Sequence, residues 1–258
     1  MTSTRQAGHK IKMTIDYSII IPAYNEENYI APTLATLQEN MSQVNLAGEI
    51  IVVDNNSSDR TAEIAGAQGA KVVFEKINQI SRARNTGARA AQGRYLFFVD
   101  ADTQIPLVLL QQALANLESG KIIGGGACVA GDIAPHYLLK PILDFWNFIS
   151  FHTRNAAGSF IYCQRDAFET IGGFSEAVYV SEEIWLSRDM KKLGKKRDQQ
   201  FSIIRQPPVI TSMRKMQWYS PPRIFLYLLL ITIFPFTVRF KSLCGMWYQR
   251  PSGPGKKS

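Results

Sequence analysis

Two patterns of apolar and polar positions alternate along the first hundred residues. Residues 17–21, 49–53 and 95–99 are continuous apolar runs rich in β-branched and aromatic side chains, as expected for strands buried on both faces. Residues 26–39 and 81–91 instead carry apolar residues at helical spacing. Strands that alternate with helices in this way predict right-handed βαβ units. We therefore expect an α/β fold with a mostly parallel, Rossmann-like sheet flanked by helices.

The same patterns predict further elements downstream. The pattern predicts a helix at 106–117 and then a strand at 122–130 that contains several glycines. An apolar, aromatic helix is expected at 137–152. Strands at 69–74 and near 160, and helices up to residue 67, at 165–171 and at 181–193, complete the prediction. Ser181 is expected to cap the last helix and Gly194 to end it.

Carboxylates stand where predicted strands end. Asp54 closes the second strand, and Asp100 and Asp102 follow the run at 95–99. In open α/β sheets ligands bind beyond the carboxyl ends of the strands, and paired carboxylates there commonly hold a hard cation. Aspartate is also common in turns and at helix N-caps, so this pattern alone supports both interpretations.

An apolar run at 224–238 has basic residues on both sides. It is shorter than the roughly 20 residues that span a bilayer and contains Pro235, so we expect interfacial docking rather than a span. The flanking residues Trp218, Tyr219 and Trp247 suit an interface. A buried C-terminal helix of a soluble enzyme is the alternative.

The charge and the cysteine content indicate which partners and which cellular compartment to expect. The 258 residues carry a net charge of +8, with much of the excess at 191–197 and after Arg214, beside the apolar run. This distribution favours an anionic membrane surface over nucleic acid. Three widely separated cysteines argue against a disulfide framework or a zinc site, and the N-terminus has no apolar signal region. We therefore expect a cytoplasmic location, peripheral on the inner face of the cytoplasmic membrane.

Two common nucleotide-binding motifs are missing. No G-x-G-x-x-G follows the first predicted strand, and no G-x-x-x-x-G-K-[ST] occurs in the chain. Dinucleotide-dependent dehydrogenases and P-loop enzymes are therefore disfavoured. Carboxylates, rather than a glycine-rich loop, are expected to meet the ligand.

Several motifs taken together resemble the inverting family 2 glycosyltransferases of the GT-A fold. These motifs are the opening strand and loop at 18–26, the strand and loop at 51–59, Arg84-Asn85-x-Gly87, Asp100-Ala101-Asp102, and Gly172-Gly173-Phe174 followed by Glu182-Glu183. They occur in the family's order over residues 17–212. Each motif is weak alone, but their common order makes the resemblance specific.

The resemblance implies a role for each matched residue. The nucleotide-sugar donor, a UDP- or GDP-sugar, would contact Pro22, Tyr24, Glu26, Asp54, Arg84, Asn85 and Asp100. Asp102, with Asp100, would hold Mg²⁺ or Mn²⁺ on the diphosphate, where the cation offsets the charge of the leaving group. Glu183, with Glu182 as the second candidate, would be the base that deprotonates the acceptor.

The chain departs from the family pattern at two points. The second acidic residue of the pair is usually aspartate, whereas this chain has Glu183, and the Q-x-x-R-W signature of processive synthases is absent. We therefore expect transfer of a single sugar to a glycan or lipid-linked acceptor. Two alternatives stay open: a membrane-docked scaffold without catalysis, and a sugar-phosphate nucleotidyltransferase.

These expectations divide the chain into four segments. Residues 1–16 would form a flexible tail and residues 17–212 the GT-A domain, with a nucleotide-binding half at 17–102 and an acceptor-binding half at 103–212. Residues 213–250 would form a membrane-associated helical segment, followed by a basic tail at 251–258.

Overall fold

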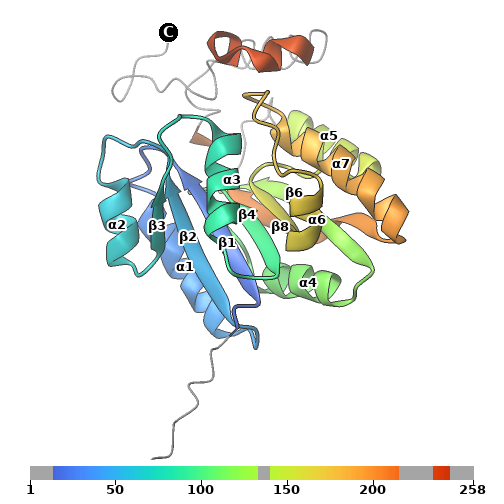
Figure 1. Ribbon diagram of the computed structural model, residues 1–258, viewed down its shortest axis with the longest axis horizontal. Helices are drawn as coiled ribbons and strands as arrows, with labels where there is room; N and C mark the ends of the chain where they lie inside the picture. Colours follow the sequence, from blue (N-terminus) through green and yellow to red (C-terminus); the bar gives the residue numbers. More distant parts are fainter. Residues whose placement is uncertain (1–13, 133–139, 215–234, 245–258) are drawn as a thin grey trace, which may run out of the picture.

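The computed structural model describes residues 14–132, 140–214 and 235–244, which form one sheet with helices on both faces (Figure 1). The strands are β1 (Tyr17–Ala23), β2 (Gly48–Asp54), β3 (Lys71–Phe74), β4 (Tyr95–Val99), β5 (Thr103–Gln104), β6 (Ile122–Gly131), β7 (Phe160–Gln164) and β8 (Gln200–Thr211). The helices are α1 (Ile30–Ser42), α2 (Thr61–Ala67), α3 (Ile80–Ala90), α4 (Leu107–Glu118), α5 (Lys140–Thr153), α6 (Arg165–Thr170) and α7 (Glu182–Arg197).

The sheet is mixed but mostly parallel, with the order β3-β2-β1-β4-β7-β6-β8-β5. The four strands of the first half pair in parallel, and β6 also runs parallel to β8. β7 lies antiparallel between β4 and β6, and β5 is antiparallel to β8. The predicted α/β architecture with a mostly parallel sheet is confirmed.

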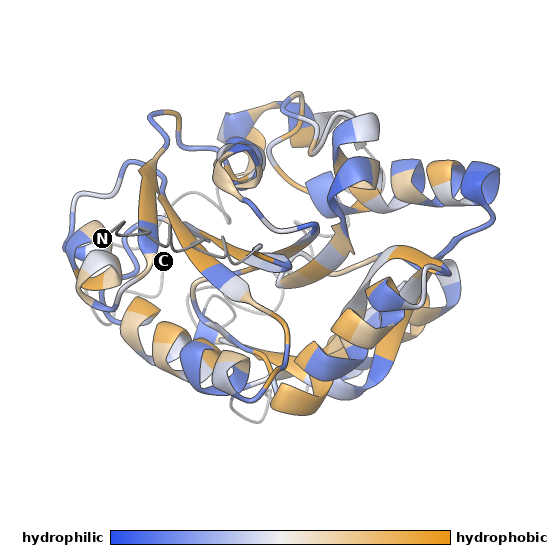
Figure 2. Cartoon of the chain, turned by 60° about the horizontal axis from the view of Figure 1, so that its bottom comes forward, coloured by the Kyte–Doolittle hydropathy of each residue, from blue (hydrophilic) through white to orange (hydrophobic). Residues whose placement is uncertain are grey.

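Each face of the sheet has its own apolar core. Alternate residues of β1 point to opposite faces, so that Ile19 and Ile21 pack with α1 and α4 while Ile20 packs under α3. Aromatic side chains continue both cores across β4: the ring centroids of Phe97 and Tyr17 lie 5.8 Å apart, and those of Phe98 and Phe174 lie 4.9 Å apart. Figure 2 shows the apolar strands at the centre and helices of mixed polarity around them.

Gly87 lets α3 lie close to the sheet. A Cβ atom at this position would stand 2.3 Å from Cγ2 of Ile20 and 2.9 Å from Cγ2 of Val53, so no larger residue fits. Arg84 stands about one turn earlier on the same helix. The glycine of the Arg84-Asn85-x-Gly87 motif therefore sets the depth at which Arg84 meets the sheet.

The sequence pattern misses β8. Pro207 and Pro208 interrupt its apolar run, and proline normally argues against a strand inside a sheet. The structure places both prolines in an irregularity: Ala127 pairs with Ile204 and Val129 pairs with Val209, so four residues of β8 lie opposite Cys128 alone. The prolines thus sit at a bulge, where a missing N–H group does not interrupt regular pairing.

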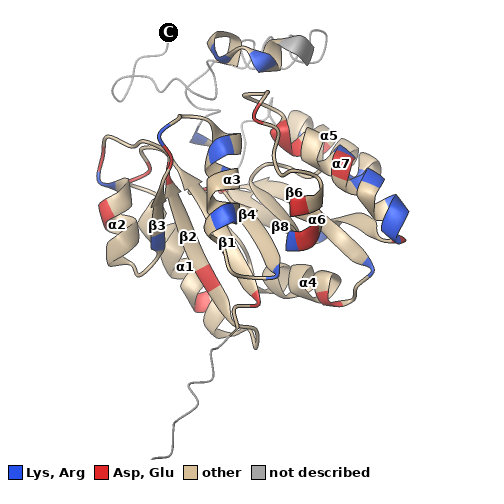
Figure 3. Cartoon of the chain, in the orientation of Figure 1, with Lys and Arg blue, Asp and Glu red and all other residues tan. Residues whose placement is uncertain are grey.

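Two expectations about α7 are wrong. The helix continues through Gly194 to Arg197, because this glycine serves close packing: a Cβ atom there would lie 2.6 Å from the carbonyl oxygen of Gln199. Ser181 precedes the helix with a φ of 65° and makes no side-chain capping bond. Basic residues gather at the C-terminal end of α7, as the sequence indicates (Figure 3).

The predicted apolar helix at 224–238 lies almost entirely outside the described residues. Within that range the structure describes only residues 235–238, which belong to a 3₁₀ helix at Pro235–Arg239 (η1), and a second one follows at Lys241–Cys244 (η2). No helix in the described ranges combines the length and apolar character that crossing a bilayer requires.

Candidate active site

Most of the predicted donor residues lie at or just beyond the carboxyl ends of β1, β2 and β4, and two, Arg84 and Asn85, lie on α3. Parallel pairing places Pro22 opposite Val53 and Ala23 opposite Asp54. Asp100 directly follows β4, the strand on the other side of β1. Three neighbouring strands therefore end in polar residues at one edge of the sheet, the position at which open α/β sheets bind ligands.

The loops after β1 and β2 hold each other in place. The backbone N–H of Asn25 donates to Oγ of Ser57 (3.0 Å), and the side chain of Asn25 accepts from the N–H of Ser58 (2.8 Å). Asp54 accepts from the N–H of Ser57 at 2.9 Å and is buried. Tyr24, in contrast, is exposed. The two loops therefore form one hydrogen-bonded wall beside which the Tyr24 ring is exposed.

Arg84 joins two acidic motifs that are far apart in sequence. Its guanidinium lies 3.0 Å from Oδ1 of Asp100 and 2.6 Å from Oε1 of Glu182, and it also donates to the carbonyl oxygen of Gly158 at 2.7 Å. Arg84 and Glu182 are fully buried, whereas Asp100 is partly exposed. We call Arg84, Asp100 and Glu182 the Arg84 cluster. The structure thus brings the Asp100-Ala101-Asp102 motif and the acidic pair to one place.

Glu182 and Glu183 have different environments. Burial raises the pKa of Glu182, and the charge of Arg84 offsets this rise only in part. Burial and the neighbouring charge of Glu182 raise the pKa of Glu183 to about 8. Gly158 lies beside Arg84 and Glu183, since a Cβ atom there would stand 3.3 Å from Nη2 of Arg84 and 3.9 Å from the carboxyl carbon of Glu183. Glu182 is engaged in an ion pair, whereas Glu183, with its pKa raised to about 8, accepts a proton as a base once the pH approaches that value.

A second ion-pair group contains the predicted metal ligand. Nη2 of Arg214 lies 2.7 Å from Oε1 of Glu26 and 3.0 Å from Oδ2 of Asp102. The guanidinium also stands 4.1 Å from the ring centroid of Tyr29. Burial lowers the pKa of Arg214, but the charges of Asp102 and Glu26 outweigh this effect and the net shift is upward. We call Arg214, Glu26 and Asp102 the Arg214 cluster.

The side-chain amide of Asn85 forms hydrogen bonds to the backbone of Phe174 and to the side chain of Glu176. Its Nδ2 donates to the carbonyl oxygen of Phe174 at 2.9 Å, and its Oδ1 accepts from the N–H of the same residue at 2.9 Å. Phe174 follows Gly172 and Gly173, which both have positive φ. The structure therefore places Asn85 at the turn that leads toward α7, rather than with the other predicted donor residues.

The carboxylates fit a divalent cation of the kind that the resemblance implies. Mg²⁺ and Mn²⁺ prefer oxygen ligands, and Mg²⁺ is usually held by one or two carboxylates together with substrate phosphates. Asp100 and Asp102 supply such oxygens at the edge where a diphosphate would lie. Within the part of the chain that the structure describes, no group of three or more acidic, histidine or cysteine side chains is arranged to hold a metal ion. The donor set therefore suits a cation shared with a substrate.

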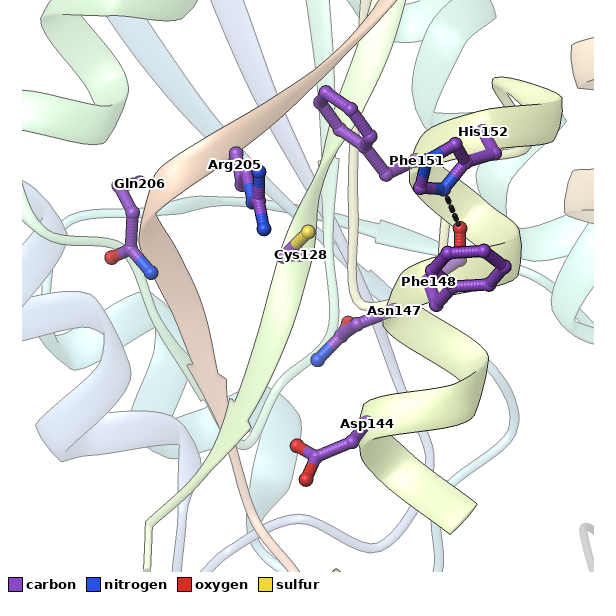
Figure 4. A pocket seen from close by; sticks show the side chains of 8 residues that line it. All are labelled: Cys128, Asp144, Asn147, Phe148, Phe151, His152, Arg205 and Gln206. Carbon is purple, nitrogen blue, oxygen red and sulfur yellow. Dashed lines mark hydrogen bonds between the residues drawn. The ribbon is translucent and has the colours of Figure 1, made fainter. Parts of the chain in front are cut away.

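A separate pocket of about 390 Å³ lies between α5 and the strands β6 and β8 (Figure 4). Its lining combines aromatic and polar side chains: Cys128, Asp144, Asn147, Phe148, Phe151, His152, Arg205 and Gln206. The guanidinium of Arg205 stands 5.4 Å from the ring centroid of Phe151, and the Phe148 and His152 rings lie 4.1 Å apart. Ligand sites in proteins typically combine apolar walls with a few placed polar groups.

The end of α5 is fastened to the helix that carries the acidic pair. Lys191 on α7 donates to the carbonyl oxygen of Thr153 and to Oδ1 of Asn155, both at 2.8 Å. Oγ of Ser187 accepts from the N–H of Ala156 at 3.0 Å and donates to the carbonyl oxygen of Glu183 at 2.7 Å. The pocket wall and Glu183 therefore belong to one hydrogen-bonded unit.

The sequence pattern gives no active-site role to Arg214 or Gly158. Arg214 reads as a basic flank of the apolar run, because its position depends on β8, which the pattern misses. Gly158 lies in a small-residue segment, and its contacts with Arg84 and Glu183 join residues that are far apart in sequence. Recognising β8 as a strand that ends near Asp102 is the signal that would have identified Arg214.

Comparisons with known proteins identify the family to which the chain is similar. The sequence profile described as glycosyl transferase family 2 matches residues 18–172, more than half of the chain. The uncharacterized glycosyltransferase EpsJ of Bacillus subtilis is 33% identical over 117 residues, which is 42% of this chain and 33% of that protein. The dolichol-phosphate mannosyltransferase of Saccharomyces cerevisiae is 39% identical over 101 residues, 36% of this chain and 38% of that protein.

A solved structure supports the fold. The mannosyltransferase PcManGT of Pyrobaculum calidifontis, in complex with GDP-Man and Mn²⁺, superposes with a TM-score of 0.59 at 17% identity. The superposition covers 93% of this chain and 76% of that one. The sequence match spans only about a third of the length of the curated relatives, whereas the profile match covers four of the five motifs in full. This chain belongs to glycosyl transferase family 2.

Proposed function

We propose that this chain is a metal-dependent glycosyltransferase that moves one sugar from a nucleoside-diphosphate sugar to an acceptor hydroxyl or phosphate, with inversion. One observation carries the proposal: Arg84 bridges Asp100 and Glu182, so that the expected diphosphate site and the residue next to the expected base, Glu183, stand on two sides of one guanidinium. A fold alone would not imply chemistry, but this arrangement of charges matches what sugar transfer requires.

The donor would lie along the carboxyl ends of β1, β2 and β4. Pro22, Tyr24 and Asp54 would contact the base and ribose, and Asp100 and Asp102 would hold Mg²⁺ or Mn²⁺. The cation, when bound, supplies positive charge that stabilises the departing diphosphate. Arg84 adds a fixed positive charge at the same edge of the sheet.

Glu183 is the proposed base. The acceptor oxygen forms a bond to the anomeric carbon while the bond from that carbon to the diphosphate oxygen breaks, and the diphosphate leaves with the electron pair. Glu183 takes the acceptor proton. Its raised pKa makes it a stronger base than an ordinary carboxylate, whereas the ion pair with Arg84 commits Glu182 to positioning. A single displacement of this kind inverts the anomeric configuration.

The acceptor is proposed to bind at α5. The pocket beside this helix offers aromatic walls with polar groups, and Phe145 and Phe148 on the same helix are 64% and 59% exposed. Exposed aromatic residues on a helix suit a membrane interface. Together with the similarity to a dolichol-phosphate mannosyltransferase, this supports a lipid-linked or envelope glycan acceptor and a peripheral position on the inner face of the cytoplasmic membrane.

The test is a transfer assay with a defined product. Purified protein is incubated with UDP- and GDP-sugars, Mn²⁺ and membrane lipid, and the anomeric configuration of the product is determined by NMR. Transfer of one sugar with inverted configuration is expected. Binding of the donor without transfer to any acceptor would favour a scaffold, and formation of a nucleotide sugar from a sugar phosphate would favour a nucleotidyltransferase.

A further inference from the structure

The pairing of β5 with β8 places Arg214 next to Asp102, a predicted metal ligand. Thr103 pairs with Thr211, and the N–H of Ser212 donates to the carbonyl oxygen of Asp102 at 3.2 Å. The N–H of Met213 donates to Oδ1 of Asp132 at 2.9 Å. The backbone just before Arg214 is therefore held beside Asp102 by defined hydrogen bonds.

The guanidinium contacts the carboxylate on which a cation would depend. Nη2 of Arg214 lies 3.0 Å from Oδ2 of Asp102 and 2.7 Å from Oε1 of Glu26. All three side chains are about nine-tenths buried. Charges attract each other more strongly in a buried site than in water. The guanidinium of Arg214 therefore already offsets much of the negative charge of Glu26 and Asp102.

A divalent cation on Asp102 would change this balance. It would place two further positive charges next to the guanidinium, and like charges at this separation repel each other. Metal binding to the empty protein would therefore compete with the ion pair between Arg214 and Asp102. A bound diphosphate would relieve the repulsion, because its oxygens accept charge-assisted hydrogen bonds from a guanidinium.

We propose that Arg214 is a positioning residue that exchanges partners during donor binding. It pairs with Glu26 and Asp102 in the empty protein, and it pairs with the diphosphate of the nucleotide once a divalent cation occupies Asp102. This inference rests on the proposed function, since it assumes that the donor is a nucleoside-diphosphate sugar. It makes Arg214 the coupling element between metal and nucleotide.

The exchange predicts mutual dependence of the two ligands. The metal alone binds weakly, because Arg214 competes for Asp102, and the nucleotide without metal binds weakly, because Arg214 stays with the carboxylates. Together each ligand strengthens the other by the same factor, as thermodynamic linkage requires. Substitution of Arg214 should act on the two binding steps in opposite directions.

Calorimetric titration tests the exchange without reference to activity. Mn²⁺ alone, and then UDP or GDP with and without Mn²⁺, are titrated into the wild type, Arg214→Gln, Arg214→Lys and Arg94→Gln. Arg94 is the matched control for net charge, since it is 57% exposed and precedes β4 at the end opposite to Asp100. Circular dichroism and the melting temperature establish that each variant is folded.

Arg214→Gln should bind Mn²⁺ alone about fivefold or more tightly and should bind the nucleotide with Mn²⁺ about fivefold or more weakly, within the usual range of coupling between sites. Arg214→Lys, which keeps the charge but loses the planar fork, should give intermediate values and serves if the glutamine variant does not fold. Arg94→Gln should bind both as the wild type does.

Three results would overturn the inference. Mn²⁺ affinity that stays the same or falls in Arg214→Gln excludes competition for Asp102. Nucleotide affinity that is unchanged in both Arg214 variants excludes contact with the diphosphate. A wild type that binds neither Mn²⁺ nor nucleotide contradicts the proposed function and this inference with it, whereas normal ligand binding without sugar transfer contradicts the proposed function alone.

Discussion

Nη1 of Arg84 lies 2.6 Å from Oε1 of Glu182, although 98 positions separate the two residues in the chain. The same guanidinium contacts Asp100 through its other terminal nitrogen. The nucleotide-binding half and the acceptor-binding half of the predicted domain are thus connected by a buried side chain. Arg84 is therefore expected to stabilise the fold and to set the distance between the diphosphate site and the proposed base.

Arg84→Gln should strongly destabilise the protein. Removal of one partner of a buried ion pair leaves an uncompensated charge, and this typically costs about 3–5 kcal/mol. Arg82→Gln is the control, since Arg82 lies on the same helix as Arg84 and forms a partly exposed ion pair with Glu176, so that its loss should cost at most about 1 kcal/mol. Urea unfolding of both variants measures the difference. Equal costs would show that the Arg84 cluster contributes nothing beyond an ordinary surface pair.

The raised pKa of Glu183 predicts how activity depends on pH. A base must be deprotonated to accept the acceptor proton, so kcat/KM should rise with pH up to about 8. Glu183→Gln should abolish transfer while leaving nucleotide affinity unchanged. A pH profile of the wild type and a binding titration of the variant check both statements. A rate that is already maximal at pH 6 would show that another group is the base.

The same pKa shift has a consequence for stability. The folded state binds the Glu183 proton more tightly than the unfolded state, whose carboxyl titrates near pH 4.3, so stability is lost as pH rises from about 4.5 to about 8. Glu183→Gln should therefore match the wild type in unfolding free energy at pH 4.5 and exceed it at pH 8.5. Glu63→Gln is the control, because Glu63 is exposed and its pKa is shifted downward. No gain at pH 8.5 would contradict the assigned environment.

Asn85→Ala distinguishes a structural role from a role in donor binding. Loss of both hydrogen bonds to Phe174 leaves buried backbone groups unpaired, and this should cost about 1–3 kcal/mol of stability. Donor affinity in the folded variant should match that of the wild type. Unfolding curves and nucleotide titrations provide the measurement. A folded variant of normal stability that binds the donor poorly would instead place Asn85 in the donor site.

The pocket beside α5 is tested through the acceptor. Phe151 and Arg205 contact each other in the wall of the pocket, and Phe151→Ala and Arg205→Gln each remove one of these partners. The KM for the acceptor should therefore rise several-fold while the KM for the donor stays constant. Val72→Ala, at an exposed position on β3 two residues before the end of the strand, is the control. Steady-state kinetics with each substrate varied in turn gives both constants. An increase in the donor KM alone would assign the pocket to another purpose.

Local sequence patterns were sufficient for most of the fold because the strands of the first half are continuous apolar runs that end in polar residues. They failed for β8, where Pro207 and Pro208 hide a strand whose bulge is visible only in its pairing with β6. They also failed at Gly194, which ends no helix and instead permits close packing on Gln199. In both cases a long-range contact decides the local structure.

In the candidate site, too, local patterns identify some residues, and long-range contacts decide the rest. Asp100, Asp102, Glu182 and Glu183 could be named from motif order, since each follows a predicted strand or begins a predicted helix. The arginines that pair with these carboxylates could not be named in this way. Arg214, for example, reaches Asp102 only through the pairing of β5 with β8. The different environments of Glu182 and Glu183 depend likewise on which carboxylate Arg84 contacts.

The most direct test of the proposed catalysis is sugar transfer by the wild type and by Asp102→Ala, each with Mn²⁺ and with a chelator. We expect the wild type to transfer one sugar from a UDP- or GDP-sugar only when Mn²⁺ or Mg²⁺ is present, and Asp102→Ala to lose at least about a hundredfold in kcat/KM, which corresponds to about 2.7 kcal/mol of transition-state stabilisation. Undiminished transfer by Asp102→Ala, or transfer by the wild type in the presence of the chelator, would contradict the account.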